Sequence, residues 1–145
     1  MTEPTKINDT LSVAGQITLA DLPNFKKNGY VTIINNRPDN EEPGQLDHAT
    51  VEAEAKKLGL EYQYQPINSA AISRKDVNEF QNLVLREGKP ILAHCRSGTR
   101  CYLMYGLSRV LNDGESAMAI VAEAATKGYD IRALPMLAER LQAEK

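Results

Sequence analysis

One stretch in the second half of the chain constrains the fold more than any other. The apolar run Pro90-Ile91-Leu92-Ala93 leads into His94-Cys95-Arg96-Ser97-Gly98-Thr99-Arg100-Cys101. A helical pattern of apolar residues follows, at Leu103, Met104, Leu107, Val110 and Leu111. A buried strand, a short glycine-containing loop and a helix in this order are typical of α/β domains, whose sites form at the carboxyl ends of strands. The sequence therefore predicts that Cys95 lies at the end of a buried strand.

The residues of this loop favour an anion. Backbone N–H groups of the loop and of the helix N-terminus stabilise negative charge, so they should lower the pKa of the Cys95 thiol. Arg100 adds a planar fork that can hold two oxygens of a tetrahedral anion. A nucleophile beside an oxyanion site predicts covalent catalysis on phosphate or on a sulfur oxyanion. The alternative is that Cys95 is only a small buried hydrophobe, which the spacing of Gly98 and Arg100 disfavours.

Strand and helix patterns alternate through most of the chain. Strands are predicted at 11–15, 30–34, 62–65 and 90–93, and helices at 18–28, 48–58, 73–88, 99–111, 115–126 and 131–143. This order predicts an α/β fold with a central, mostly parallel sheet, flanked by helices on both faces, and a helical C-terminus. Residues 1–10 are predicted to be a flexible tail, and residues 11–145 a single domain.

Composition excludes several classes of function. The net charge of the 145 residues is −2 and no basic block is present, so neither nucleic acid nor an anionic membrane is an expected partner. No apolar run approaches the length of a membrane span. The chain has two cysteines and two histidines, without zinc-ligand spacing, so no metal and no cofactor are expected. A reducing, cytoplasmic location is predicted, or a periplasmic one if a signal peptide has been removed.

Several motifs beyond the cysteine loop carry a family resemblance. They are Gly15-Gln16, Ile34-Asn35-Asn36-Arg37-Pro38-Asp39, Glu41-Glu42-Pro43-Gly44-Gln45 and the loop from His94 to Arg100. In this order they resemble the dual-specificity branch of the cysteine-dependent protein phosphatases. They resemble more closely a bacterial family of beta-lactamase-hydrolase-like, phosphatase-like domains. The resemblance covers about residues 11–129.

The resemblance implies a cysteine-phosphatase-like fold and gives roles to matching residues. Cys95 would be the nucleophile, and Arg100 would bind the oxyanion and stabilise the transition state. His94 would either tune the thiolate or be a core histidine that ends a strand. Arg37 would either face the site or pair on the surface with Asp39 or Glu41. The substrate-binding cradle would be lined by the backbone amides of Arg96, Ser97, Gly98 and Thr99.

Three features depart from the phosphatase pattern. Only four residues separate Cys95 from Arg100, where the phosphatase signature has five; four is the rhodanese length. The loop after the preceding strand, 66–71, holds no carboxylic acid, although Asp39, Glu41 or Glu42 could replace it from another loop. Without general-acid help the rate typically falls by about 10²–10⁴-fold. Cys101 stands where a serine or threonine is usual, and either packs in the helix or forms a disulfide with an oxidised Cys95.

Three hypotheses follow from these residues. The favoured one is a phosphatase-like hydrolase that forms a phosphocysteine at Cys95 from a phosphorylated small molecule or protein side chain. The second is a sulfurtransferase that carries a persulfide on Cys95, supplied by thiosulfate or another persulfide. The third is a non-catalytic anion-binding or redox-sensing module that uses Cys95 and Cys101. Phosphate or sulfate is the anion expected to occupy the loop in all three.

Overall fold

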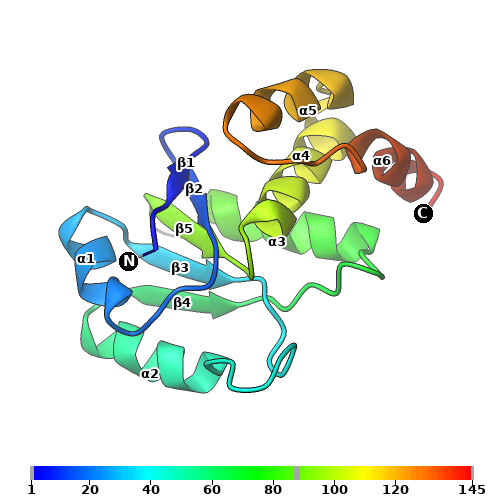
Figure 1. Cartoon of the computed structure of the whole chain (residues 1–145). Coiled ribbons are helices and arrows are strands. Elements are labelled where there is room, and N and C mark those ends of the chain that lie inside the picture. Colours follow the sequence, from blue (N-terminus) through cyan, green and yellow to red (C-terminus); the bar gives the residue numbers. More distant parts are fainter. Residues whose placement is uncertain (1, 87–88, 145) are drawn as a thin grey trace.

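The structure, a computed structural model, describes residues 2–86 and 89–144, and within these residues the chain forms a five-stranded sheet. The strands are β1 (Thr5–Lys6), β2 (Leu11–Ala14), β3 (Thr32–Asn35), β4 (Glu61–Tyr64) and β5 (Ile91–His94). Their order across the sheet is β1-β2-β5-β3-β4 (Figure 1). All neighbouring strands are parallel except β1, which pairs antiparallel with β2 at one edge.

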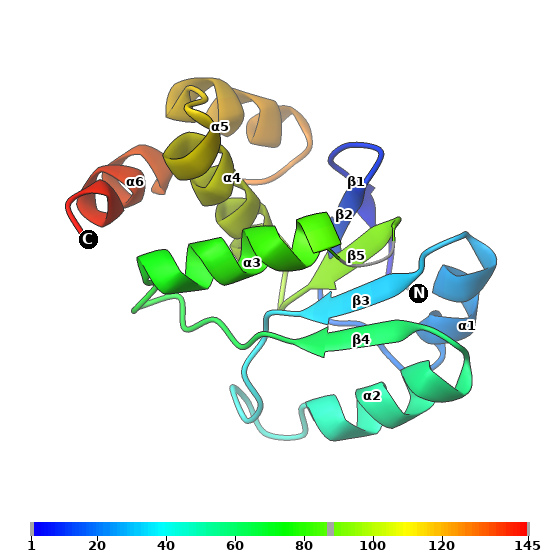
Figure 2. The same cartoon turned by 180° about the vertical axis from the view of Figure 1, so that it is seen from behind.

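Helices cover both faces of the sheet. They are α1 (Asp21–Lys27), α2 (His48–Lys57), α3 (Arg74–Arg86), α4 (Thr99–Asp113), α5 (Ala117–Thr126) and α6 (Leu134–Gln142). Helices α1 and α2 lie against one face, whereas α3 and α4 cover the other, with α5 and α6 packed on α4 (Figures 1 and 2). Within the described residues, no helix combines the length and the apolar character that crossing a bilayer requires.

The two central strands, β3 and β5, explain why helices cover both faces of the sheet. Side chains of a strand alternate between its faces, and both faces of β3 and β5 are apolar. Ile33 and Leu92 pack with the residues of α1 and α2, whereas Ile34 and Ala93 pack with those of α3 to α6. The predicted α/β fold, with its mostly parallel sheet and helical C-terminus, is therefore confirmed.

The N-terminal segment differs from the flexible tail predicted for residues 1–10. Thr5 pairs with Val13 and Lys6 with Ser12, which makes this segment an edge strand, and Ile7 is buried in the core. A strand of only two residues has no periodicity that the sequence could reveal. The pairing also protects the edge of β2, which would otherwise present open backbone groups.

Helix starts are set by local side chains. Helix α3 begins with a capping box: the Ser73 hydroxyl accepts from the Asp76 amide, and the Asp76 carboxylate accepts from the Ser73 amide. The helix predicted from residue 18 begins later, at Asp21, and no side chain of the described residues caps it. The Asp21 carboxylate instead accepts from the Thr18 amide. The end of α3 predicted at Gly88 lies outside the described residues.

The parallel strands end together, and this convergence positions the site. The last residues of three neighbouring strands, Ala14, His94 and Asn35, are paired partners across the sheet. The segments that leave these strands therefore meet at one edge. They include the Gly15-Gln16 motif, the loop that carries Arg37 and the two glutamates, and the cysteine loop.

Candidate active site

The cysteine loop joins β5 to α4. Cys95 follows the last residue of β5, and α4 begins four residues later at Thr99. The Gly98 N–H donates to Cys95 Sγ at 3.1 Å. Cys95 is only 1% exposed, so its sulfur lies at the bottom of the loop rather than on the surface. The strand–loop–helix prediction is confirmed, and the loop amides surround the sulfur as an anion site requires.

Two glycines permit this tight loop. Gly98 has a φ of +91°, a left-handed conformation that other residues rarely adopt. A side chain there would also lie 3.0 Å from the Tyr129 ring and hydroxyl. Gly15 approaches the loop from β2, and a Cβ at this position would lie 3.0 Å from the Arg96 carbonyl oxygen. The Gln16 amide donates to that same oxygen at 3.1 Å, so the Gly15-Gln16 motif supports the loop from below.

The Cys95 thiol is strongly acidic. Hydrogen bonding from the Cys101 side chain lowers its pKa to about 5 against the opposing effect of burial, and the amides of Cys101, Ser97 and Gly98 add to the effect. Cys101 is itself fully buried, and burial together with the neighbouring Cys95 raises the pKa of Cys101 well above its usual value. Cys101 is thus a neutral donor, and Cys95 is a thiolate at neutral pH.

Arg100 extends from the first turn of α4 toward two other segments. Its Nη1 donates to the Ile67 carbonyl at 2.9 Å and to the Asn36 carbonyl at 3.3 Å. Glu41 accepts from both terminal nitrogens, at 3.0 Å from Nη1 and 3.1 Å from Nη2. The Nε atom is buried and has no hydrogen-bond partner among the described residues. Glu41 and the two carbonyl oxygens therefore fix the orientation of the guanidinium.

Glu41 links Arg100 to a second arginine. Arg37 donates from Nε to Glu41 at 2.9 Å, pairs with Glu42 at 3.1 Å, and donates to the Gln16 side chain at 3.0 Å. Only 2% of the Arg37 side chain is exposed. Burial opposes ionisation of Glu41, but hydrogen bonds from Arg100 and Arg37 outweigh it and lower the Glu41 pKa. The predicted pairing of Arg37 with Glu41 is confirmed, but it is buried rather than on the surface.

His94 lies behind the site. It is completely buried, and neither ring nitrogen meets a partner at hydrogen-bonding geometry among the residues that the structure describes. Burial lowers its pKa to about 4, with the Cys95 backbone acting in the opposite direction. The imidazole is therefore neutral and gives the thiolate no positive charge. This geometry fits the core interpretation of His94 better than the thiolate-tuning one.

Asp39 lies apart from the cysteine loop in its contacts. Its carboxylate accepts from the His48 amide at 2.9 Å and pairs with the His48 ring. That ring stacks on Tyr64, whose hydroxyl accepts from the Asp39 amide. Asp39 thus fixes the start of α2. Because Asp39, Glu41 and Glu42 are all bound to basic partners, none is placed as a free proton donor.

A cavity of about 320 Å³ opens over the loop. Cys95, Arg96, Ser97, Thr99 and Arg100 of the predicted site residues line it, whereas Gly98, Arg37 and Asp39 do not. The remaining lining residues are Ser69, Leu103, Asp130, Ile131 and Ala133. Neither Ser69 nor Asp130 was predicted from the sequence as a site residue. Both come from segments far from the cysteine in sequence, and no local pattern marks them.

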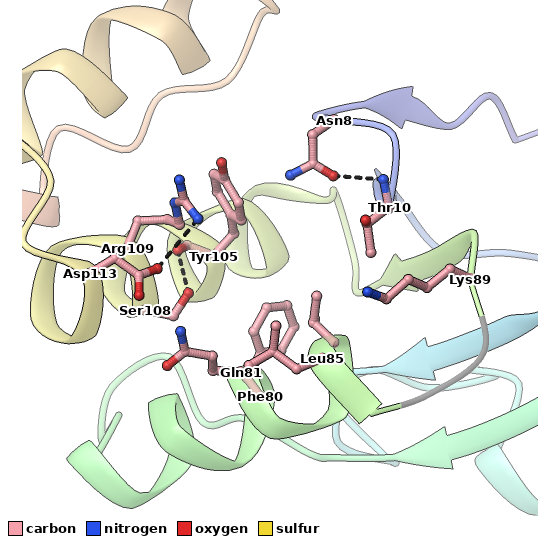
Figure 3. A pocket seen from close by; sticks show the side chains of 11 residues that line it. Asn8, Thr10, Phe80, Gln81, Leu85, Lys89, Tyr105, Ser108, Arg109 and Asp113 are labelled. Atoms are coloured by element: carbon pink, nitrogen blue, oxygen red, sulfur yellow. Dashed lines mark hydrogen bonds and ion pairs between the residues drawn. The ribbon is translucent and has the colours of Figure 1, made fainter.

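A second pocket, of about 300 Å³, lies elsewhere on the molecule (Figure 3). Phe80 and Leu85 of α3, Tyr105 and Arg109 of α4, and Asn8 of the β1–β2 turn contribute to its lining. It contains none of the predicted site residues. Within 2–86 and 89–144, no three His, Cys, Asp or Glu side chains gather as a metal site would require.

Fold and loop together define the class of this protein as a phosphatase-like α/β domain. A family model described as "Beta-lactamase hydrolase-like protein, phosphatase-like domain" matches residues 5–112. The chain belongs to this family, and the resemblance seen in the sequence is confirmed.

Relatives of known name agree with this assignment. The beta-lactamase hydrolase-like protein of Agrobacterium fabrum is 34% identical over 138 residues, which cover 95% of this chain but 32% of the relative. The chain thus spans about a third of that relative's length.

Two solved structures share the fold. A candidate phosphatase from Neisseria meningitidis superposes with a TM-score of 0.81 at 33% identity, covering 97% of this chain and 96% of its own. P. aeruginosa TpbA, solved in complex with phosphotyrosine, superposes with a TM-score of 0.68 at 15% identity, covering 97% and 83%.

Proposed function

We propose that this domain is a cysteine-dependent phosphatase that hydrolyses phosphate monoesters through a phosphocysteine at Cys95. The observation that carries the proposal is the buried Cys95 thiolate, held by the Gly98 amide at 3.1 Å beside Arg100 in one cavity. The family and the fold of its solved neighbours support the same class of reaction.

In the first step, the Cys95 thiolate attacks phosphorus and the ester oxygen leaves. The thiolate needs no base, because its pKa of about 5 keeps it ionised at neutral pH. Charge that develops on the phosphoryl oxygens is stabilised by the loop amides and by the guanidinium of Arg100, which lines the same cavity. Glu41 and the two backbone carbonyls fix the other side of the guanidinium. Arg100 is therefore already oriented when substrate binds, so little conformational entropy is lost in aligning it.

The leaving group departs with little help from the protein. The loop after β4 contributes Ser69 to the cavity, and Ser69 is not a carboxylic acid. Substrates with acidic leaving groups should then react fastest, which favours aryl esters such as phosphotyrosine, whose phenol has a pKa of about 10. The fold neighbour bound to phosphotyrosine supports this class of substrate. We infer that aryl phosphates are the preferred substrates.

The proposal is tested by the initial rate on p-nitrophenyl phosphate. We expect turnover by the wild type, background rates for Cys95→Ser, and a loss of about 10²–10³-fold for Arg100→Ala. Arg100→Lys keeps the charge but loses the planar fork, so it should recover only part of the rate. Wild-type turnover that survives Cys95→Ser would overturn the proposal.

A sulfurtransferase is the second candidate, favoured by the four-residue spacing between Cys95 and Arg100. The Cys95 thiolate would attack the outer sulfur of thiosulfate, so that sulfite leaves and a cysteine persulfide forms. Cyanide would then take the outer sulfur as thiocyanate and return the thiolate. Thiocyanate production from thiosulfate and cyanide, lost in Cys95→Ser, would favour this reaction over phosphate hydrolysis if the aryl phosphate is not turned over.

A further inference from the structure

One carboxylate shares the cavity with the thiolate. Among the residues that line the cavity over Cys95, Asp130 is the single Asp or Glu within the described chain. It belongs to the segment between α5 and α6, and the cysteine loop forms another wall of the same cavity. Asp130 therefore borders the same cavity in which a phosphocysteine would form and react.

Asp130 pairs with Arg132 and lies next to a buried residue of the same segment. Arg132 donates from Nε and from its backbone amide to one carboxylate oxygen, at 2.9 Å and 3.1 Å, and from Nη2 to the other at 2.9 Å. The next residue, Ile131, is 2% exposed and anchors the segment in the core, as does Leu134. The ion pair is exposed, with 61% of the Asp130 side chain and 83% of the Arg132 side chain accessible to solvent, and the buried Ile131 and Leu134 anchor the backbone that carries it.

The charges around Asp130 keep it ionised. Hydrogen bonds from the Arg132 side chain and backbone hold the pKa of Asp130 below its usual value. Two cations, Arg96 and Arg100, line the same cavity from the cysteine loop. Among the described lining residues, the Cys95 thiolate is the one other negative charge besides Asp130. A carboxylate that is ionised at neutral pH cannot protonate a leaving group, but it can accept a proton from water.

We propose that Asp130 is the general base of the second step, which orients and deprotonates the water that hydrolyses the phosphocysteine. This inference rests on the proposed phosphatase function and adds a residue to it. Asp130 would touch the attacking water, so it would be a catalytic residue rather than a support for one.

The second step transfers the phosphoryl group from sulfur to water. The water oxygen forms a bond to phosphorus while the bond between phosphorus and Cys95 Sγ breaks, and its electron pair returns to sulfur as the thiolate. The water proton passes to the Asp130 carboxylate, and hydrogen phosphate leaves. Asp130 then loses the proton to solvent, and no oxidant or reductant takes part.

The role is tested with Asp130→Asn, which keeps the shape of the side chain and removes the base. With p-nitrophenyl phosphate, whose leaving group needs no acid, the variant should still release one nitrophenolate per site in a rapid burst. The rate after the burst should fall by about 10²-fold, and phosphocysteine should accumulate in acid-quenched samples. The matched control is Asp113→Asn, an exposed aspartate paired with Arg109, which should leave both phases unchanged.

Arg132→Gln gives a second readout. Loss of this cation should raise the pKa of Asp130, so the acid limb of the post-burst rate should move to higher pH. Cys95 does not titrate in that phase, because its sulfur is bonded to phosphorus. An unmoved acid limb would contradict the role of Asp130.

The outcomes separate the two proposals. If the wild type releases nitrophenolate and Asp130→Asn behaves like the wild type, the role of Asp130 is overturned and the phosphatase remains. If Asp130→Asn loses the burst while Cys95 is still alkylated normally, Asp130 acts in the first step and the second-step role is wrong. If the wild type forms no phosphocysteine, the proposed phosphatase function itself fails, and the role of Asp130 with it.

Discussion

At the scale of single residues, two neighbouring thiols decide the reactivity of the site. The sequence left open whether Cys101 packs in its helix or forms a disulfide with Cys95. In the structure both are free thiols; Cys101 is buried in the core, and its side chain hydrogen-bonds the Cys95 sulfur. The disulfide stays a prediction. The contact itself gives Cys101 a function that the sequence did not indicate, namely donation to the thiolate.

This contact makes Cys101→Ala informative. A hydrogen bond to a charged group is worth about 1.5–3 kcal/mol, so losing it should raise the Cys95 pKa by about one to two units. The alkylation rate of Cys95 by iodoacetamide, followed against pH, reports that pKa directly. Cys101→Ser keeps a donor and should stay close to the wild type. Equal midpoints for the alanine and serine variants would contradict the role of the thiol.

A second residue-scale prediction concerns Glu41, which bridges Arg37 and Arg100. Glu41→Gln should lower kcat/KM by about tenfold, because Arg100 loses the charged partner that orients it. It should also lower the free energy of unfolding by about 1–3 kcal/mol, since buried Arg37 is left with a weaker partner.

The matched control for Glu41 is Glu42→Gln. Glu42 pairs with Arg37 and lies 3.9 Å from Arg96, but no contact joins it to Arg100. Denaturant unfolding and initial rates on both variants separate stability from catalysis. We expect Glu42→Gln to change stability more than the rate. If the two variants lose the same activity, the orienting role of Glu41 is wrong.

At the scale of secondary-structure elements, local patterns predicted most of the fold. The strand, loop and helix around Cys95 could be read because apolar runs, glycine and capping residues act over a few neighbours. The Ser73–Asp76 capping box is another such local signal. The edge strand β1 was not predicted, because only Thr5 and Lys6 form it. Asp130 was not predicted as a site residue, because it shares a cavity with Cys95 only through the packing of α5 and α6, and no local sequence pattern indicates this packing.

Helix α4 depends on the conformation of the glycine before it. Gly98→Ala would force a left-handed conformation on alanine and press its Cβ to 3.0 Å from Tyr129. We expect a loss of about 1–3 kcal/mol in unfolding free energy. Cys95 alkylation should also slow at pH 6, since the displaced Gly98 N–H no longer reaches the sulfur.

Gly114→Ala is the control at the other end of α4. Gly114 also has a positive φ, of +71°, but nothing lies within 4 Å of an added Cβ. It should show the backbone cost alone, of about 1 kcal/mol, with no change in Cys95 reactivity. Chemical denaturation and alkylation of both variants test this difference. Equal losses of stability would mean that the Tyr129 contact is unimportant.

At the scale of the whole molecule, the site is assembled from segments that only the fold brings together. The Gly15-Gln16 turn, the loop with Glu41, the cysteine loop and the Asp130 segment follow four different elements. The sequence motifs revealed three of them, because family resemblance marks them. The resemblance could not show that Glu41 pairs with Arg100. It also could not show that His94 is buried without a hydrogen-bond partner among the described residues.

The sealed His94 makes the stability of the whole fold depend on pH. Its folded pKa is about 4, whereas an unfolded histidine has a pKa of about 6.5. Between these values the unfolded chain binds the proton and the folded chain does not, so stability falls as pH decreases. From pH 7 to pH 5 this linkage amounts to about 2 kcal/mol. Cys95, with its pKa lowered to about 5, acts in the same direction over pH 5–9 and must be removed first.

The measurement is therefore made on Cys95→Ser, by urea unfolding between pH 7 and pH 5. We expect the free energy of unfolding to fall by about 2 kcal/mol, and adding His94→Asn should flatten the curve. Four carboxylates have lowered pKa values, Asp21, Glu41, Asp47 and Asp130, and their contribution to stability is lost mainly below pH 5, outside the measured range. If His94→Asn does not fold, the slope of Cys95→Ser alone remains decisive. A flat curve in that protein would mean that His94 is protonated in the folded state, and its neutral core role would be wrong.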